Sequence, residues 1–229
     1  MLNKKNFYID GKWVSPIEAR SHKVIDPSNE EPCAEISLGG KKDIDKAVSA
    51  AKKAFETWSF TKKEERLELL EKLYVIYKKR WAEMAKLISL EMGAPMKFST
   101  EMQAATGASH IKSFKSILKD FKFEKDLGEE KNNQKLLYEP KGVCALITPW
   151  NWPINQVNLK VIPALASACT VVLKPSEIAP LSSMLLAEMI DEAKFPSGVF
   201  NLINGDGAIT GDALTSHPDI NMISFTGST

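Results

Sequence analysis

Short apolar runs alternate with longer amphipathic segments along the second half of the chain. Four of these runs are rich in β-branched residues, and they occupy positions 143–149, 170–175, 199–203 and 221–225. Segments with a helical pattern lie between them at positions 154–168, 182–194 and 209–217. Strands that are apolar throughout are buried on both faces, and their alternation with helices is typical of βαβ units. The pattern therefore predicts an α/β fold in which helices cover both faces of a parallel sheet.

The first half of the chain has the period of amphipathic helices. Apolar residues recur at helical spacing over 44–58 and again over 70–88, after which the sequence EMGAP ends the second stripe. Thr61 and Glu64 have the spacing of a capping box at the start of that stripe. A third helical stretch covers 99–121. The simplest interpretation of these three segments is that they pack against the sheet.

Turn signals indicate strands outside the helices. An Asp-Gly pair at positions 10–11 lies between two short aromatic or β-branched runs, which is a strong hairpin signal. A looser strand pair follows, and Pro27 and Pro32 restrict it to an edge position because proline cannot donate to a ladder. The stretch 122–140 is polar and ends in a short alternating strand at 135–138, which indicates an excursion from the main body.

Composition excludes several classes of partner. The 30 basic and 29 acidic residues give a net charge of +1 with no long run of one sign, so no nucleic-acid or anionic-membrane surface is expected. The chain has no signal-peptide pattern and no 18-residue apolar run, which indicates a soluble cytoplasmic protein. Cys33, Cys144 and Cys169 are widely spaced and the three His are scattered, so neither a disulfide framework nor a metal site is expected.

Unusual residues follow each predicted strand of the second half. In open parallel sheets, ligands bind beyond the carboxyl ends of the strands. After the first strand, the sequence TPWNWP places two Pro and two Trp around a single amide, Asn151. Its side-chain N–H can donate to a developing oxyanion. Capping of the next helix explains Asn151 equally well at this point.

The other strand ends carry a cation, a carboxylate and glycines. Lys174 and Glu177 in KPSE can grip a ribose diol, although a solvated ion pair explains them as well. Gly205, Gly207 and Gly211 in NGDGAITG have the spacing G-x-G-x-x-x-G, which departs from the dinucleotide fingerprint and indicates a tight turn close to a ligand. The sequence FTGST, at the end of the chain, has the composition of a phosphate-binding turn.

Taken together and in this order, these motifs resemble the aldehyde dehydrogenase superfamily. The matching stretches are GVCALITPWNWP, PALASACTVVLKPSEIAPLSS, FPSGVFNLINGDGAITGDALTSHPDI and SFTGST, with agreement upstream in FYIDGKWV, IDPSNEEPCAEI and the helices. The resemblance implies a Rossmann-like NAD(P) domain preceded by hairpins and long helices, and a small oligomerisation hairpin. The expected parts are 1–121, the first portion of the NAD-binding domain, 122–141, a partial oligomerisation hairpin, and 142–229, the Rossmann-like core.

The resemblance also implies roles for individual residues. Asn151 would hold the oxyanion. The residues implied to contact the cofactor are Ile147, Thr148, Pro149 and Trp150 at the nicotinamide, Lys174 and Glu177 at the adenosine ribose, Gly207 and Gly211 near the adenine, and Ser228 near the pyrophosphate. Ser176, Phe225, Thr226 and Gly227 are also expected to bind the cofactor. Glu177 favours NAD over NADP, because its charge repels a 2′-phosphate. The implied substrate is a small-molecule aldehyde, and the implied assembly of the full-length enzyme is a homo-oligomer.

In the family reaction, a Cys thiolate attacks the aldehyde, hydride passes to NAD, and a water activated by Glu releases the acid. The family's nucleophilic Cys and its general-base Glu lie downstream of the FTGST motif, whereas Cys144 and Cys169 read as core residues. The sequence thus predicts an incomplete aldehyde dehydrogenase fold that is inactive alone. The alternative is a non-catalytic fragment that binds nucleotide or pairs with another subunit.

Overall fold

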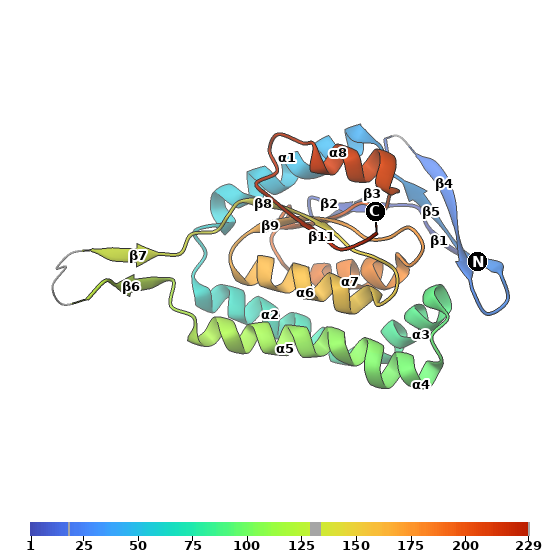
Figure 1. The fold of residues 1–229 in the computed structure, drawn as a ribbon, viewed down its shortest axis with the longest axis horizontal. Helices are drawn as coiled ribbons and strands as arrows, with labels where there is room; N and C mark the ends of the chain where they lie inside the picture. Colours follow the sequence, from blue (N-terminus) through green and yellow to red (C-terminus); the bar gives the residue numbers. More distant parts are fainter. Residues whose placement is uncertain (18, 129–133, 229) are drawn as a thin grey trace.

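The structure, a computed structural model, describes residues 1–17, 19–128 and 134–228. Within these residues the centre is a six-stranded sheet with the order β11-β8-β9-β10-β2-β3 (Figure 1). Its strands are β2 (Phe7–Ile9), β3 (Lys12–Val14), β8 (Val143–Ile147), β9 (Thr170–Lys174), β10 (Phe200–Leu202) and β11 (Met222–Phe225). Strands β8 to β11 are parallel, which confirms the prediction for the second half. The predicted hairpin at positions 10–11 is also present, and it extends this sheet by pairing antiparallel to β10.

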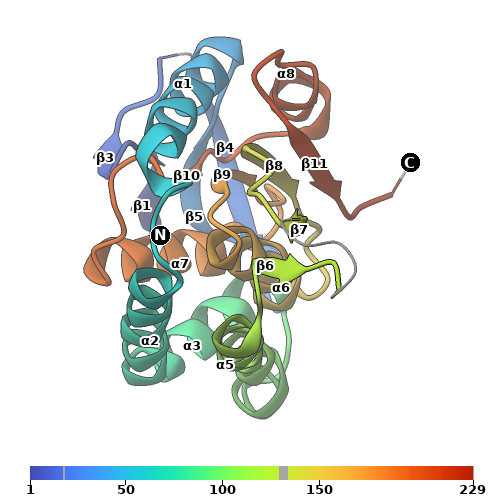
Figure 2. The same cartoon turned by 90° about the vertical axis from the view of Figure 1, so that its left-hand side faces the viewer.

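Helices cover both faces of the sheet, as predicted (Figure 1 and Figure 2). One face carries α1 together with η2 and α8, the opposite face carries α6 and α7, and α2, α3 and α5 form an outer layer against α6 and α7. The helices are α1 (Lys41–Trp58), α2 (Lys63–Lys79), α3 (Trp81–Met92), α4 (Met96–Phe98), η1 (Ser99–Gln103), α5 (Ala104–Asp120), α6 (Pro153–Ala166), α7 (Leu181–Glu192), η2 (Gly207–Gly211) and α8 (Asp212–Thr215). The fold is therefore a doubly wound α/β sheet with an added helical layer.

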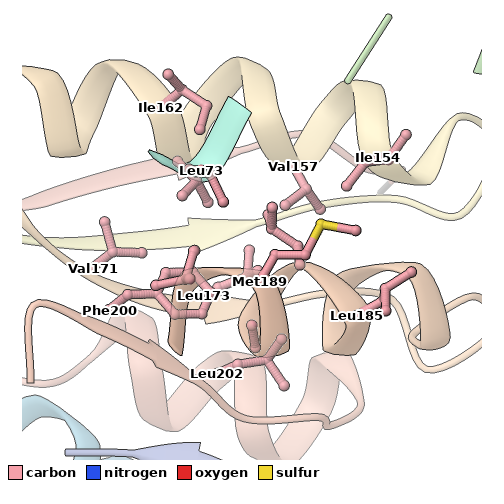
Figure 3. Packing of buried hydrophobic residues seen from close by; sticks show 14 of the residues in the cluster. Leu73, Ile154, Val157, Ile162, Val171, Leu173, Leu185, Met189, Phe200 and Leu202 are labelled. Carbon is pink, nitrogen blue, oxygen red and sulfur yellow. The ribbon is translucent and has the colours of Figure 1, made fainter. Parts of the chain in front are cut away.

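The strand side chains alternate between two hydrophobic clusters, as strands buried on both faces require. Ile147 of β8 belongs to the cluster beneath α1, whereas its neighbour Leu146 belongs to the cluster on the α6 side. Figure 3 shows the second cluster, in which Leu173 of β9 and Phe200 of β10 lie between the sheet and the helices. Leu73 of α2 reaches the same cluster, so the outer layer shares this core.

The apolar stripe predicted as one helix forms two helices. Arg80 departs from helical geometry with φ −98° and ψ 15°, and it separates α2 from α3. Helix α2 is capped by Glu65, which accepts the N–H of Lys62 at 3.4 Å. The hydroxyl of Thr61 instead donates to the carbonyl of Trp58 at 2.6 Å. The predicted capping box at Thr61 is therefore wrong, because Thr61 closes the end of α1.

The third predicted helical stretch is confirmed as η1 and α5. Gly107 lies inside α5, where glycine weakens a helix. A Cβ atom there would collide with the hydroxyl of Tyr77 in α2. The Gly107 carbonyl also accepts a hydrogen bond of 2.9 Å from Nδ2 of Asn158 in α6. The glycine therefore lets α5 approach α2 and α6 closely.

Helix α7 begins on a buried carboxylate. Glu91, near the end of α3, is 1% exposed and accepts the backbone N–H groups of Leu181 and Ser182, the latter at 3.0 Å. Burial raises the pKa of Glu91 to about 7, against the opposing effect of these hydrogen bonds. One side chain thus joins the outer helical layer to the layer on the sheet.

A second sheet lies beside α3 and has the order β1-β5-β4. Its strands are β1 (Leu2–Lys4), β4 (Arg20–Asp26) and β5 (Glu31–Leu38), with an irregularity between Val24 and Ile25. The predicted irregular strand pair is β4 and β5, but the expected edge position is wrong for β5, which is central. Pro32 is tolerated because β1 pairs with β5 only from Ala34 onward.

The excursion predicted over 122–140 is a two-stranded ribbon that projects from the main body (Figure 1). Strands β6 (Glu124–Asp126) and β7 (Lys135–Leu137) pair antiparallel. The sequence indicates β7 but not β6, because Glu, Lys and Asp are poor strand formers. The segment 129–133 of this predicted hairpin lies outside the described residues.

Strand β11 departs from the prediction of burial on both faces. Met222, Ile223 and Phe225 are 45%, 46% and 58% exposed, because β11 pairs only with β8 at the edge of the sheet. Across the part of the chain that the structure describes, no helix combines the length and the apolar character needed to cross a bilayer.

Candidate functional site

The parallel register places three strand ends side by side. Ile147 at the end of β8 is level with Lys174 of β9 on one side and with Phe225 of β11 on the other. The chain runs from β8 through β9 to β10 and then returns to place β11 on the far side of β8. Strand order thus reverses at β8, and such a switch point opens a crevice at the carboxyl edge of the sheet.

A groove of about 490 Å³ lies at this edge. Its lining residues are Ile147, Thr148, Pro149, Trp150, Asn151, Gln156, Lys174, Ser176, Glu177, Ile178, Gly207, Phe225, Thr226, Gly227 and Ser228. Of the sequence-predicted site residues, the groove omits only Gly211, which lines an adjoining hollow of about 350 Å³ together with Gly207 and Lys174. The turns after β8, β9, β10 and β11 therefore meet in one place.

The turn after β8 is anchored through Trp152 and not through Asn151. The Trp152 indole N–H donates to the Thr106 hydroxyl at 3.2 Å, and its ring packs on Phe98 with centroids 5.8 Å apart. Trp152 is also the N-cap residue of α6, and Pro153 follows at the first helical position. This placement excludes the alternative in which Asn151 caps the helix. The exposed amide of Asn151 lines the groove and makes no hydrogen bond to a described residue.

Lys174 uses its ammonium group inside the protein. Its Nζ donates to the carbonyls of Gly205 at 2.6 Å and Pro175 at 3.1 Å, and it lies 3.6 Å from a carboxylate oxygen of Glu177. Lys174 is 4% exposed, and burial lowers its pKa while Glu177 opposes that shift. The lysine therefore ties the Gly205 turn to the end of β9 and fixes Glu177 at the groove.

The turn after β9 presents Glu177 to the groove. The Ser176 hydroxyl accepts the N–H of Ile178 at 3.3 Å, which closes the turn. The Glu177 side chain is 29% exposed, so its carboxylate is accessible to a ligand while it also forms an ion pair with the buried ammonium group of Lys174. A carboxylate in this position accepts hydrogen bonds from the hydroxyl groups of a ligand.

Two features of the groove fit a bound polar ligand. The Thr148 hydroxyl is buried and has no hydrogen-bond partner among the described residues, although buried polar atoms are normally paired. A Cβ atom added to Gly207 would meet no described heavy atom within 4 Å. No contact with a described residue therefore requires glycine at this position. A ligand that forms a hydrogen bond with the Thr148 hydroxyl and approaches the backbone of Gly207 accounts for the unpaired hydroxyl and for the open space beside the glycine.

Gln156 and Ile178 line the groove and are absent from the sequence-based prediction. Gln156 lies in the first turn of α6, and a helix that follows a parallel strand starts at the carboxyl edge of the sheet. That rule was sufficient to add Gln156 to the site predicted from the sequence. Ile178 is 49% exposed and follows Glu177 directly, and its side chain carries no chemical signal of its own.

The three cysteines lie away from the groove. Cys144 and Cys169 are 1% and 4% exposed and belong to the core, which confirms the prediction for both. Cys33 lies in β5, where its Sγ donates to the Val24 carbonyl at 3.4 Å. Burial and the nearby Asp26 carboxylate raise the pKa of Cys33, so its thiolate is disfavoured.

The sequence matches the aldehyde dehydrogenase family over residues 13–229. The chain belongs to this family. It is 50% identical, over its whole length, to the 3-succinoylsemialdehyde-pyridine dehydrogenase of a Pseudomonas species, and it covers 47% of that protein. The chain therefore spans about half the length of the curated relatives that it matches.

Solved structures of the family agree with the fold. An aldehyde dehydrogenase from Bartonella henselae superposes with a TM-score of 0.97 at 59% identity, and the match covers 100% of this chain and 48% of that one. A variant of an aldehyde dehydrogenase from Pseudomonas syringae, solved with NAD+ and octanal, superposes with a TM-score of 0.92 at 44% identity, covering 96% of this chain and 44% of that one. The family, the α/β fold and the likeness to dehydrogenases of known NAD+ complexes are thus established.

Proposed function

We propose that the chain is the NAD-binding half of an aldehyde dehydrogenase that oxidises an aldehyde to a carboxylic acid. The main support for this proposal is that the turns after parallel strands β8, β9 and β11, together with Gly207, line a single groove at the switch point of the sheet. The alternative, a fragment that binds nucleotide or another subunit without catalysis, uses the same groove and differs only in the absence of chemistry.

The proposed contacts follow the order of the groove. The turn 147–150 lies along the nicotinamide, with the Thr148 hydroxyl gaining the partner that it lacks. Glu177 accepts hydrogen bonds from the ribose hydroxyls, and Lys174 and Ser176 hold it in place. Gly207 and Gly211 admit the adenine half, and the turn 225–228 faces the pyrophosphate. NAD supplies the hydride acceptor, and Asn151 donates its amide N–H to the oxygen of the reacting aldehyde.

Titration of the chain with dinucleotides tests the binding proposal. We expect a saturable calorimetric signal with NAD and a weaker one with NADP, because the 2′-phosphate of NADP meets the Glu177 carboxylate. The Gly207→Ala variant should bind NAD about tenfold more weakly, since the new methyl group occupies the space of the ligand. Its unfolding temperature should not fall, because the methyl group touches nothing in the free chain.

Gly205→Ala is the matched comparison for that variant. A Cβ atom on Gly205 collides with Thr210, so this substitution should lower the unfolding temperature as well as the affinity. The absence of heat with millimolar NAD would contradict the proposal. Equal NAD affinity of Gly207→Ala and the unmodified chain would remove Gly207 from the site.

The chain alone is proposed to be catalytically inactive. Among the described residues the groove contains no Cys, and the core thiols cannot reach it. We therefore expect no formation of NADH, followed by its absorbance, when the purified chain is mixed with NAD and an aldehyde such as octanal. Turnover by a preparation of verified mass would overturn this proposal without affecting the binding proposal.

The projecting ribbon is proposed to take part in oligomerisation. Leu127, Leu136, Leu137 and Tyr138 are 41–58% exposed on it, and both strands have free edges. The test uses an oligomeric enzyme that contains this chain and carries Leu136→Ser and Leu137→Ser together. An unchanged sedimentation coefficient of this double variant would contradict the role in oligomerisation.

A cytoplasmic location remains a prediction, for which the three free thiols are the supporting feature.

A further inference from the structure

The turn that carries Gly207 is held from two sides. From the sheet, Lys174 donates to the carbonyl of Gly205, as described above. From the second sheet, Arg20 of β4 donates through Nη1 to Oδ2 of Asp206 at 2.5 Å. Arg20 and Asp206 are 186 positions apart in sequence, and both lie outside the lining of the groove.

Asp206 organises the turn itself. Its Oδ1 accepts the backbone N–H groups of Ile209 at 2.8 Å and Thr210 at 3.3 Å, so the side chain caps η2. Its carbonyl accepts the N–H of Gly211 at 3.0 Å, which closes the π-type turn. Asp206 thus shapes the backbone on which Gly207 and Gly211 face the groove and the adjoining hollow.

The Gly39 carbonyl completes the anchor. It accepts Nη2 of Arg20 at 3.1 Å and the hydroxyl of Thr210 at 2.6 Å. The guanidinium therefore binds two groups at once, the Asp206 carboxylate and the Gly39 carbonyl, as its fixed fork geometry allows. Gly39 lies between β5 and α1, and its N–H donates to the Asn204 carbonyl at 2.9 Å, so the Gly39 anchor is itself bonded to the chain just before the Gly205 turn.

Arg20 also compensates the charge of the Asp206 carboxylate, which lies within electrostatic reach of Lys174. Asp206 interacts electrostatically with Lys174, whose ammonium already serves Glu177 and two carbonyls. Without Arg20, the Asp206 carboxylate is drawn toward Lys174 and competes with Glu177 for it. We therefore expect loss of Arg20 to displace the backbone of Gly207, which follows Asp206 directly in the chain, and to weaken the contact between Lys174 and Glu177.

We propose that Arg20 and Asp206 form a positioning pair. The pair fixes the Gly205–Gly211 turn, relative to the groove, where the adenosine half of the dinucleotide requires it. Neither side chain touches the nucleotide. The pair acts through the backbone of Gly207 and through the Lys174–Glu177 contact. This inference rests on the proposed NAD site and adds to it two residues from the first and second halves of the chain.

Calorimetric titration of the chain with NAD, AMP and nicotinamide mononucleotide tests the pair. Arg20→Met keeps the apolar stem and removes the charge, and Asp206→Asn keeps an oxygen for the two N–H groups of η2. Each variant should bind NAD and AMP about five- to tenfold more weakly and nicotinamide mononucleotide unchanged, because only the adenosine side moves. The double variant should bind no more weakly than Arg20→Met, because Arg20→Met already removes the ion pair with Asp206.

Lys52→Met is the matched control. It removes an ion pair of similar length, Lys52–Asp219 at 2.6 Å, which lies away from the groove. Its affinities should equal those of the unmodified chain. If the unmodified chain binds NAD, and Arg20→Met binds NAD and AMP as tightly as the unmodified chain does, the positioning role is wrong and the NAD site stands. An additive double variant, or equal loss of nicotinamide mononucleotide, also overturns the role. Absence of NAD binding by the unmodified chain overturns both proposals.

Discussion

Glu91→Ala is expected to lower the free energy of unfolding by about 3 kcal/mol or more, because two buried N–H groups at the start of α7 lose their acceptor, each at about 1–3 kcal/mol. Glu91 is 1% exposed, so water cannot replace the carboxylate without opening the contact between α3 and α7. Denaturant unfolding followed by circular dichroism measures the loss. Lys86→Ala, on the exposed side of α3, is the control and should be near neutral.

The same carboxylate gives a pH dependence with a defined sign. In the folded chain the pKa of Glu91 is about 7, above its value of 4.5 in the unfolded chain, so the folded state binds the proton more tightly. The stability contributed by protonated Glu91 is complete below pH 4.5 and is lost as pH rises through about 7. Glu91→Gln does not titrate. The unfolding free energy of the unmodified chain relative to Glu91→Gln should therefore fall by on the order of 3 kcal/mol across this window. A difference that is independent of pH would contradict the burial argument.

Asn151→Ala is expected to lower kcat by about 100- to 1,000-fold in an active enzyme, which corresponds to the loss of one oxyanion donor. A suitable enzyme is a hybrid in which these 229 residues replace the corresponding half of the Pseudomonas relative, to which they are 50% identical. The Asn151 amide is exposed in the groove and binds no described residue, so its removal should not disturb the turn held by Trp152.

The NAD affinity of the hybrid separates catalysis from folding. Asn151→Ala should bind NAD as the unmodified hybrid does, while Trp152→Ala should weaken NAD binding because it releases the turn. Asn151→Asp has nearly the same shape but no amide donor, and it should be as slow as Asn151→Ala. Full activity of Asn151→Asp or Asn151→Ala would remove the oxyanion role.

Local sequence patterns were sufficient for the parallel strands and for the residues at their carboxyl ends. The reason is geometric: β8, β9 and β11 are mostly apolar segments, and parallel pairing brings Ile147, Lys174 and Phe225 to one level regardless of the loops between them. Because parallel strands end at the same edge of the sheet, the turns that follow them lie together there. The meeting of these turns at one edge therefore follows from the strand pattern, whereas their roles toward NAD, which the family resemblance implies, stay predictions.

Contacts between distant segments were not predictable in this way. Glu91 and Leu181 are 90 positions apart, and the 3.6-residue period contains no information about which helix end meets a buried carboxylate. The pairing of the first hairpin with β10 and the central place of β5 depend likewise on tertiary packing. The break at Arg80 was missed because the apolar period continues across it, while Arg80 binds Glu188 of α7 at 2.6 Å and turns the chain.

Binding of NAD in one groove at the carboxyl edge of the parallel sheet can be tested residue by residue. The most direct measurement is an NMR titration of the isotope-labelled chain with NAD, in which shifted backbone amides are mapped onto the structure. We expect saturable shifts in the turns 147–151, 174–178, 205–211 and 225–228, with the ribbon unaffected. Shifts confined to other surfaces, or none at millimolar NAD, would contradict it.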